Sequence, residues 1–296
     1  MSDLKYGCID AGTENCPCHL AKTGDCIYCS RLAGKDYCDC DWQGVCVFNE
    51  FHQNGEKIQA ARNEFAARIV NRKQYMEDLY TLELDTGKGF AIKALPPGSF
   101  VSVKNPKCSD WYSMPLSIIG CDTEKGHIHI AVKKISAKSK MILESTESLA
   151  VRGVFRNGII GIDKVTKIKS PVAVISKGIG FAAAAHFINS YPDSDVYIDT
   201  DKICQSFVRD YMPQNFRGRL RYADLNEEKH SLVKELAKYK GAVIATSEYF
   251  EEFFETNCGD RLQLAVLNNY SICCGEGICG ACCDKNGSKM CKCRGR

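Results

Sequence analysis

The chain concentrates its cysteines at its two ends. Of 19 cysteines in 296 residues, eight lie in residues 1–46, seven lie in residues 273–293, and four occupy the 226 residues between them. An odd number cannot all pair within one chain, and a disulfide scaffold spreads its cysteines through a small secreted domain. The first twelve residues lack the apolar stretch of a signal peptide. We therefore expect thiolate-bound metal at one end at least, in a cytoplasmic protein.

The composition is that of an ordinary globular chain. The sequence is 45% hydrophobic and 25% charged, and its net charge of +3 predicts no general affinity for nucleic acid. No apolar run approaches the ~18 residues that a membrane-spanning helix needs. At ~150 residues per domain, the length suggests about two domains.

Residue patterns divide the chain into four segments and predict an α+β multidomain protein. Residues 1–52 are short cysteine-rich loops that cannot bury much of a core, so we expect metal to hold their shape. Residues 53–165 and 166–272 have the apolar patterns of folded domains. Residues 273–296 form the second cysteine-rich segment.

The second segment predicts an antiparallel β-barrel or sandwich, because several short runs alternate between apolar and polar residues. These runs are residues 67–70, 79–84, 100–103 and 127–132.

The third segment predicts an α/β domain with a parallel sheet, because buried apolar strands alternate with helical stretches. The strands are expected at 172–175, 195–199 and 242–245, and the helices at 181–190, 232–238 and 248–256.

The C-terminal cysteines have the spacing of an iron–sulfur loop. Cys274, Cys279 and Cys282 follow the Cys-x4-Cys-x2-Cys pattern of plant-type [2Fe–2S] ferredoxins, and Cys291 is the expected fourth ligand. The intervening glycines let backbone N–H groups approach the sulfurs. A zinc knuckle is the alternative, but it usually pairs two short hairpins, so this spacing fits it less well.

With this tail after a barrel and a nucleotide domain, the chain resembles electron-transfer subunits of the ferredoxin–NADP reductase superfamily. Similar proteins are the electron-transfer subunit of dihydroorotate dehydrogenase and the small subunit of NADH-dependent ferredoxin–NADP oxidoreductases. The resemblance covers residues ~60–293. It implies FAD on the barrel, NAD(P)H on the α/β domain and a [2Fe–2S] cluster in the tail. It also implies a hetero-oligomer with a catalytic redox subunit or a ferredoxin-like protein.

The resemblance places the flavin beside residues 114–117, where the family's Arg-Pro-x-Ser segment reads Met-Pro-Leu-Ser. Methionine thus replaces the arginine that pairs with the FAD pyrophosphate, and the family's phosphate turn is altered at residues 137–140. Residues 127–170 hold nine basic and three acidic side chains, and lysine can neutralise a phosphate without arginine's bidentate fork. The implied flavin contacts are Met114, Pro115, Leu116, Ser117, Val132, Lys133, Ser139 and Lys140.

A glycine turn marks the expected dinucleotide site. Gly178 and Gly180 follow a predicted strand and open a predicted helix, where backbone N–H groups attract a pyrophosphate. Asp199 ends the next strand, a position from which a carboxylate bonds the ribose 2′-hydroxyl of NADH. The nearby Lys202 leaves NADPH open. The family's Cys-Gly-Pro nicotinamide segment is replaced at residues 245–247, so the use of a pyridine nucleotide also stays open.

The N-terminal cysteines suit two four-ligand sites, but their gaps match neither the bacterial ferredoxin run nor a zinc ribbon. Because the same chain has predicted flavin, nucleotide and [2Fe–2S] sites, an additional iron–sulfur centre, such as a [4Fe–4S] cluster, is favoured over zinc. The candidate ligands are Cys8, Cys16, Cys18, Cys26, Cys29, Cys38, Cys40 and Cys46.

Together these features predict an iron–sulfur flavoprotein that passes electrons between NAD(P)H, FAD, a [2Fe–2S] cluster and a partner. No side chain is required as an acid or base, because the cofactors carry the chemistry. Two alternatives stay open. One is a non-enzymatic, metal-stapled adaptor on an eroded reductase fold, and the other is a protein-to-protein electron relay without pyridine nucleotide.

Overall fold

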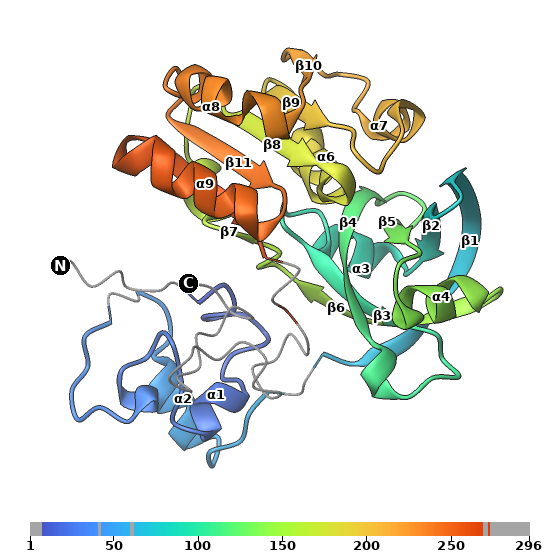
Figure 1. Cartoon of the computed structure of the whole chain (residues 1–296). Helices are drawn as coiled ribbons and strands as arrows, with labels where there is room; N and C mark the ends of the chain where they lie inside the picture. The colour runs from blue at the N-terminus through green and yellow to red at the C-terminus, as the bar shows by residue number, and fades with distance from the viewer. Residues whose placement is uncertain (1–7, 41–42, 60–61, 269–271, 273–296) are drawn as a thin grey trace. The chain divides into compact units, whose positions relative to one another are not determined.

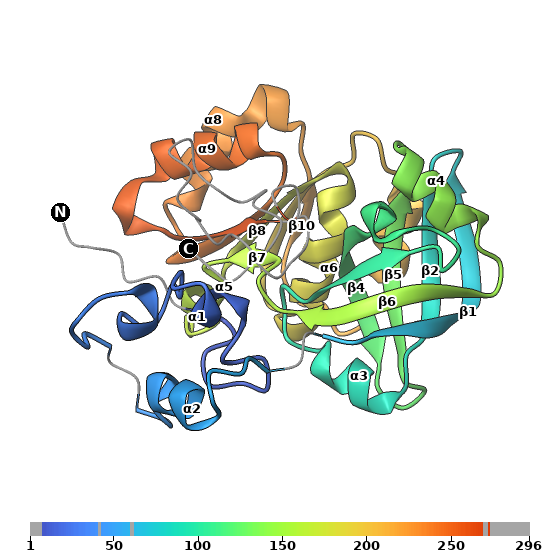
Figure 2. The ribbon, with the colours of Figure 1, turned by 90° about the horizontal axis from the view of Figure 1, so that it is seen from below.

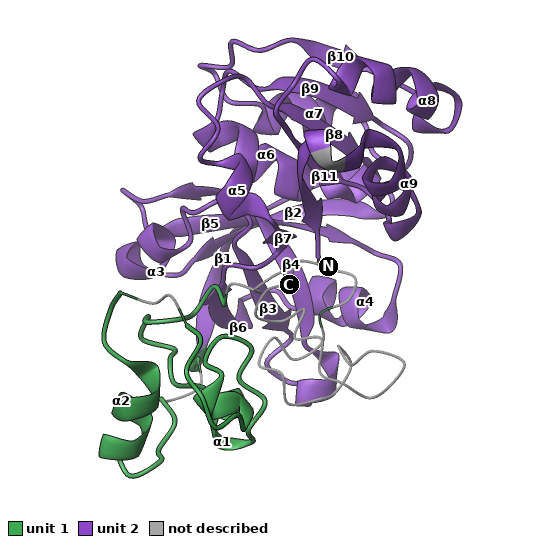
Figure 3. Ribbon diagram, turned by 90° about the vertical axis from the view of Figure 1, so that its left-hand side faces the viewer, with its two compact units in different colours: residues 1–64, 271–296 green, residues 65–270 purple. Residues whose placement is uncertain are grey.

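The computed structural model of the chain describes residues 8–40, 43–59, 62–268 and 272. The chain forms two compact units (Figure 3). Unit 1 comprises residues 1–64 and 271–296, and unit 2 comprises residues 65–270.

Unit 1 contains short helical segments joined by loops. They are α1 (His19–Lys22), η1 (Arg31–Ala33) and α2 (Val47–Gln53). An apolar cluster of five buried side chains joins them: Ala21, Cys29, Leu32, Val47 and Phe51. So small a core supplies little folding free energy, which is the condition in which bound metal contributes most to stability.

A buried ion pair ties the two ends of the described part of unit 1. Nη2 of Arg62 donates to both carboxylate oxygens of Asp10, at 2.9 and 3.0 Å. The backbone N–H of Gln59 also donates to the carbonyl oxygen of Pro17, at 2.9 Å. These contacts fix the loop that carries the first cysteines against the segment that precedes the barrel.

The first half of unit 2 is a closed six-stranded barrel (Figure 2) with the strand order β1-β2-β5-β4-β3-β6. The alternating pattern forms it, because one face of each strand packs inside and the other faces outward. Leu82, Val101 and Ile130 are among the fully buried residues of its interior. The predicted antiparallel barrel is thus confirmed. Its strands are β1 (Glu64–Met76), β2 (Leu79–Asp85), β3 (Phe100–Lys104), β4 (Met114–Asp122), β5 (His127–Lys133) and β6 (Ser148–Phe155), and two helices, α3 (Lys88–Lys93) and α4 (Ala137–Glu144), connect strands of the barrel.

The second half of unit 2 is a six-stranded sheet with the order β10-β9-β8-β11-β12-β7 and helices on its two faces (Figure 1). Alternate residues of a central strand serve different faces: Val174 packs with the α6 side and Ile175 with the α8 and α9 side. The strands are β7 (Ile159–Ile160), β8 (Ala173–Lys177), β9 (Asp195–Asp199), β10 (Leu220–Tyr222), β11 (Gly241–Ala245) and β12 (Gln263–Leu267). The helices are α5 (Ile162–Val165), α6 (Phe181–Ser190), α7 (Gln205–Tyr211), α8 (Leu225–Leu236) and α9 (Glu248–Cys258).

The sheet is mixed, whereas the sequence predicts a parallel one. Five strands are parallel, but β7 pairs with β12 in the antiparallel direction. The reason is its place in the chain, since β7 leaves the barrel and reaches the sheet edge before the first strand–helix–strand unit. The helix predicted at 232–238 begins earlier, at Leu225, because the carboxylate of Asp224 accepts the N–H groups of Asn226 and Glu227.

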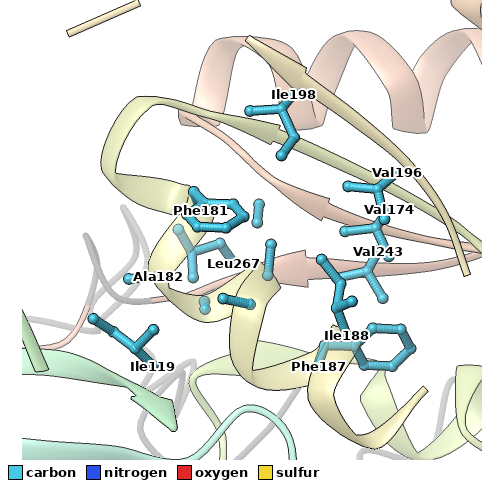
Figure 4. Close-up of a cluster of buried hydrophobic side chains, with 14 of the residues drawn as sticks. Ile119, Val174, Phe181, Ala182, Phe187, Ile188, Val196, Ile198, Val243 and Leu267 are labelled. Carbon is cyan, nitrogen blue, oxygen red and sulfur yellow. The ribbon is translucent and has the colours of Figure 1, made fainter. Parts of the chain in front are cut away.

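Helix α6 joins the barrel to the sheet. Ile119 of β4 belongs to the same buried cluster as Phe181 and Ala182 of α6 (Figure 4). Nε2 of His186, also on α6, lies 3.1 Å from the carbonyl oxygen of Leu95 and 3.2 Å from that of Pro96. The barrel and the sheet are therefore packed as one body. Among the described residues, none of the helices combines the length and apolar character that crossing a membrane requires.

We expect unit 2 to lose stability as the pH falls below the ordinary range of histidine. Burial lowers the pKa of His186 below 6.5, although its carbonyl partners act in the opposite direction. The unfolded chain then binds more protons, so the contribution of neutral His186 is complete above about pH 6.5 and is lost as the pH falls toward the depressed pKa. Thermal unfolding between about pH 7 and pH 5 measures this loss.

A His186→Gln variant should show a shallower decline of stability with falling pH than the wild type, because glutamine keeps an N–H donor and does not titrate. Some decline should remain, because burial also lowers the pKa of His129. His230→Gln removes an exposed histidine and should leave the decline unchanged. Parallel curves for the wild type and His186→Gln would contradict the role given to His186.

Candidate functional site

Residues 114–117 begin strand β4 in the barrel wall. Met114 lies opposite Val103 of β3, and Ser117 lies opposite Phe100. The side chain of Leu116 is buried in the barrel core and Met114 packs against that core. Because successive strand residues face opposite sides, Pro115 and Ser117, both half-buried, lie on the outer face. One face of the predicted flavin segment thus packs on the barrel core, and the other face lies on the outside of the barrel, where a ligand could bind.

The predicted phosphate turn lies beside the start of this strand. Nζ of Lys138, on α4, donates to the carbonyl oxygen of Ser113 at 2.9 Å. The contact brings together two segments that are more than twenty residues apart in the chain and that the sequence predicts to share one ligand. Lys140, two residues after Lys138, is exposed.

A pair of serines closes the N-terminus of α4. Oγ of Ser136 accepts the N–H of Ser139 at 3.2 Å, and Oγ of Ser139 accepts the N–H groups of Ile135 and Ser136, each at 3.0 Å. Ser139 is fully buried by this capping box. Its hydroxyl therefore holds the helix start, and its assignment as a cofactor contact remains a prediction.

The other two predicted flavin residues of the barrel have partners within the protein. The side chain of Val132 is completely buried in the barrel core. Nζ of Lys133 lies 3.0 Å from the Asp78 carboxylate and also donates to the carbonyl oxygen of Lys202. Lys133 therefore links the barrel to the loop after β9, and its predicted contact with a flavin stays untested.

An exposed tryptophan adjoins the flavin segment, and the sequence analysis did not identify it. Trp111, in the turn η2 (Asp110–Tyr112) that packs against α4, is 85% exposed. Among the described residues it is the most exposed large apolar side chain. The only sequence signal is its place, three residues before Met114.

The glycine turn lies at the switch point of the sheet. From β8 the chain passes through α6 to β9, whereas β11 lies on the other side of β8. A crevice at the carboxyl ends of the strands where the order reverses is where open α/β sheets bind their ligands. Gly178 has φ +55°, and a Cβ on Gly180 would lie 2.0 Å from the carbonyl oxygen of Ala245. The two predicted glycines are therefore required by the backbone itself.

Asp199 lies at the same edge, but its carboxylate already accepts three donors. They are Nζ of Lys177, the N–H of Asp201 at 2.9 Å and the N–H of Leu225 at 3.0 Å. Burial raises the pKa of Asp199, but these hydrogen bonds outweigh burial and the net shift is downward. The carboxylate is ionised and only 8% exposed. Whether it bonds a ribose stays a prediction.

All eight N-terminal cysteines lie in unit 1. Burial is the main reason why the pKa of Cys16 rises to about 11, and the neighbouring thiols of Cys18 and Cys26 add to it. Within the described ranges, no three or more histidine, cysteine or acidic side chains are gathered closely enough to hold a single metal ion. The predicted ligands of the [2Fe–2S] cluster, Cys274, Cys279, Cys282 and Cys291, lie outside the described residues.

Comparison with known proteins identifies the fold. No family profile and no curated protein sequence matches the chain. A solved NADH-dependent reduced ferredoxin–NADP oxidoreductase matches with a TM-score of 0.52 and 15% identity, covering 75% of this chain and 81% of that chain. The ferredoxin reductase of carbazole 1,9a-dioxygenase matches with a TM-score of 0.51 and 12% identity, covering 69% of this chain and 67% of that one.

A type IV self-sufficient cytochrome P450 monooxygenase has a similar part, with a TM-score of 0.52 and 15% identity over 74% of this chain and 35% of that chain. These likenesses show that the chain has a ferredoxin-reductase-like fold. The expected resemblance is confirmed at this level, and the narrower identity of an electron-transfer subunit stays a prediction.

Gly180→Ala should destabilise unit 2 by about 1–3 kcal/mol or more, because the added Cβ collides with the Ala245 carbonyl and forces the turn away from β11. Urea or thermal unfolding measures the change. Gly89→Ala in α3 is the matched control, since its Cβ would meet nothing within 4 Å. That variant should keep its stability or gain up to about 1 kcal/mol. A Gly180→Ala protein as stable as the wild type would refute the close approach.

Proposed function

We propose that this chain is an electron-transfer oxidoreductase subunit that passes electrons between NAD(P)H, FAD, a [2Fe–2S] cluster and a partner redox protein. The main support is the arrangement of unit 2, where a closed barrel carries residues 114–117 and a sheet carries a glycine turn at its switch point. The order of these parts is the one expected from the family resemblance. The Cys-x4-Cys-x2-Cys spacing of the tail supports the cluster.

The outer face of the barrel near β4 has the side chains that a flavin dinucleotide needs. Lys138 is a cation held beside the flavin segment, where the family uses arginine. Its present acceptor is a neutral carbonyl oxygen, and a phosphate oxygen would bind it more strongly because both partners are then charged. The exposed ring of Trp111 offers a flat apolar surface for a planar ring system. When bound, FAD exchanges hydride with a nicotinamide and single electrons with an iron–sulfur centre.

The nucleotide end of the site contains both an acceptor and cations. Asp199 keeps lone pairs beyond the three donors it accepts, so a ribose hydroxyl can share it. Lys177 is 3.5 Å from Asp201 as well as paired with Asp199, and it is a cation at the edge where a phosphate would bind. The set therefore supports a pyridine nucleotide of either kind.

A second function, a non-enzymatic adaptor on the same fold, is favoured by one observation. Three of the polar groups predicted to meet cofactors, the Lys133 ammonium, the Ser139 hydroxyl and the Asp199 carboxylate, have partners within the protein. An adaptor needs neither flavin nor nucleotide, so its binding behaviour differs from that of an oxidoreductase.

The test is to purify the full chain without oxygen, to assay its flavin, iron and sulfide, and to titrate it with NADH and NADPH separately. An oxidoreductase contains flavin, and the flavin absorbance bleaches with at least one of the two nucleotides. Bound flavin that only a redox partner reduces indicates the relay without pyridine nucleotide. A colourless protein that ignores both nucleotides indicates the adaptor and overturns the proposal.

Lys138→Met should weaken FAD binding about tenfold, or ~1.4 kcal/mol, because it removes the cation beside the flavin segment and keeps the length of the side chain. The fluorescence of released FAD gives the dissociation constant. Lys238→Met removes the same charge from an exposed position after α8 and should leave FAD affinity unchanged. Equal affinities for both variants would exclude Lys138 from the site.

A further inference from the structure

We propose that unit 1 contains two separate metal centres, each with four cysteine ligands. The ligands of the first centre are Cys8, Cys16, Cys18 and Cys26, and those of the second are Cys29, Cys38, Cys40 and Cys46. The assignment of ligands to the two centres is argued only from residues of unit 1. Only the use of the centres in electron transfer rests on the proposed function.

The first support is spatial, because the cysteines line two different hollows. The smaller hollow, of about 20 Å³, is lined by the four ligands of the first centre and by Cys29. The larger hollow, of about 280 Å³, is lined by the four ligands of the second centre. Tyr28, Cys29 and Val47 line both hollows and so form the wall between them.

The second support is a repeat in the chain. The first four cysteines are separated by 7, 1 and 7 residues, and the second four by 8, 1 and 5 residues. Each half therefore has a long gap, a central Cys-x-Cys pair and a second long gap. The halves meet between Cys26 and Cys29, which is also where the two hollows divide. Chain order and spatial position thus give the same partition.

One short contact lies within the second set, and another crosses the boundary between the two sets. Within the second set, the Sγ atoms of Cys38 and Cys40 are 3.6 Å apart. At the boundary, the backbone N–H of Cys29 lies 3.3 Å from Sγ of Cys26. An N–H donated to a ligand sulfur stabilises its thiolate form. The backbone of Cys29 thus supports the first centre, while its side chain is left for the second.

The size of the second hollow favours a cluster over a single ion. Zinc binds sulfur at ~2.3 Å, so four zinc ligands enclose a space of ionic size. A hollow of about 280 Å³ is much larger. An iron–sulfur cluster, with several irons and bridging sulfides, needs such a space.

The surroundings of both hollows suit bound thiolates. Arg31 lines the second hollow, and its guanidinium lies 4.9 Å from the centre of the Phe48 ring, which also lines it. A fixed cation there offsets the negative charge of four thiolates. Asp10 lines the first hollow, and its buried pairing with Arg62 fixes the loop between Cys8 and Cys16.

The test uses the full chain, purified without oxygen, with matched substitutions in the two central pairs. Cys18→Ser and Cys40→Ser each change the second cysteine of a Cys-x-Cys pair, and the double variant changes both. Cys108→Ser, in unit 2, is the control. Iron, zinc and acid-labile sulfide are counted per chain, and alkylation followed by mass spectrometry reports which cysteines are protected.

Each single variant should lose the metal of one centre and keep the other, and the double variant should lose both. In Cys18→Ser, the other cysteines of the first set should become reactive while the second set stays protected. The reverse pattern is expected for Cys40→Ser. Iron lost together with sulfide identifies a cluster, and zinc lost alone identifies a single ion. Cys108→Ser should match the wild type.

The proposal is overturned if either single variant empties both sets, which indicates one shared centre, or if neither changes the metal count. Should a serine variant fail to fold, metal is removed stepwise from the wild type with a chelator. Two centres predict that the cysteines then become reactive to alkylation in two groups of four. Flavin content is measured in parallel. If the wild-type chain holds both metal centres but its flavin is not reduced, the proposed function is refuted and this inference still stands.

Discussion

Unit 2 depends on the packing of helix α6 against both of its halves. Every residue from Phe181 to Ile188 is buried, which is the pattern of a helix enclosed on all sides. One side packs on the parallel strands and the other meets Ile119 of the barrel strand β4. Removing any of these side chains would leave a cavity that opens the junction of the two halves.

The same helix connects the two candidate cofactor segments. The glycine turn ends at Gly180, the residue before the helix, and its position is set by the carbonyl of Ala245. Ile119, which packs on the helix, lies two residues after Ser117 on the same face of β4. The glycine turn and residues 114–117, the two predicted cofactor segments, are therefore held by one buried element. This coupling is what a reaction between two cofactors requires, because transfer depends on a fixed geometry between them.

The sequence predicts the fold well where the pattern reflects local burial. The runs at 79–84 and 127–132 alternate over part of their length and correspond to β2 and β5. The residue pattern does not predict strand β4, because Pro115 and the adjacent Ile118 and Ile119 break the alternation of apolar and polar residues. The two-residue β7 and the largely exposed, three-residue β10 are too short to show a period. Their places are set by pairing with distant strands, which no local pattern records.

The candidate site shows the same limit. The glycines could be predicted because a glycine turn between a strand and a helix is a local sequence pattern, and Gly178 has a positive φ there. The contact that excludes a Cβ at Gly180, with the carbonyl of Ala245, comes from a distant strand and is not visible in that pattern. The partners of Asp199 could not be predicted, because the N–H of Leu225 comes from 26 residues away in the chain. Likewise, nothing in the sequence near Lys138 shows that its ammonium reaches Ser113.

The described parts of the two units differ in how much apolar surface they bury, and the proposed metal centres lie in the unit that buries less. Unit 2 contains three large apolar clusters, whereas the apolar cluster in the described part of unit 1 has five buried members, one of them a cysteine. Where so little apolar area is buried, the four-thiolate metal centres proposed above would contribute folding free energy directly. The cysteines are thus concentrated in the part of the chain where the hydrophobic effect contributes least. In unit 2, where apolar burial suffices, the few cysteines are scattered singly.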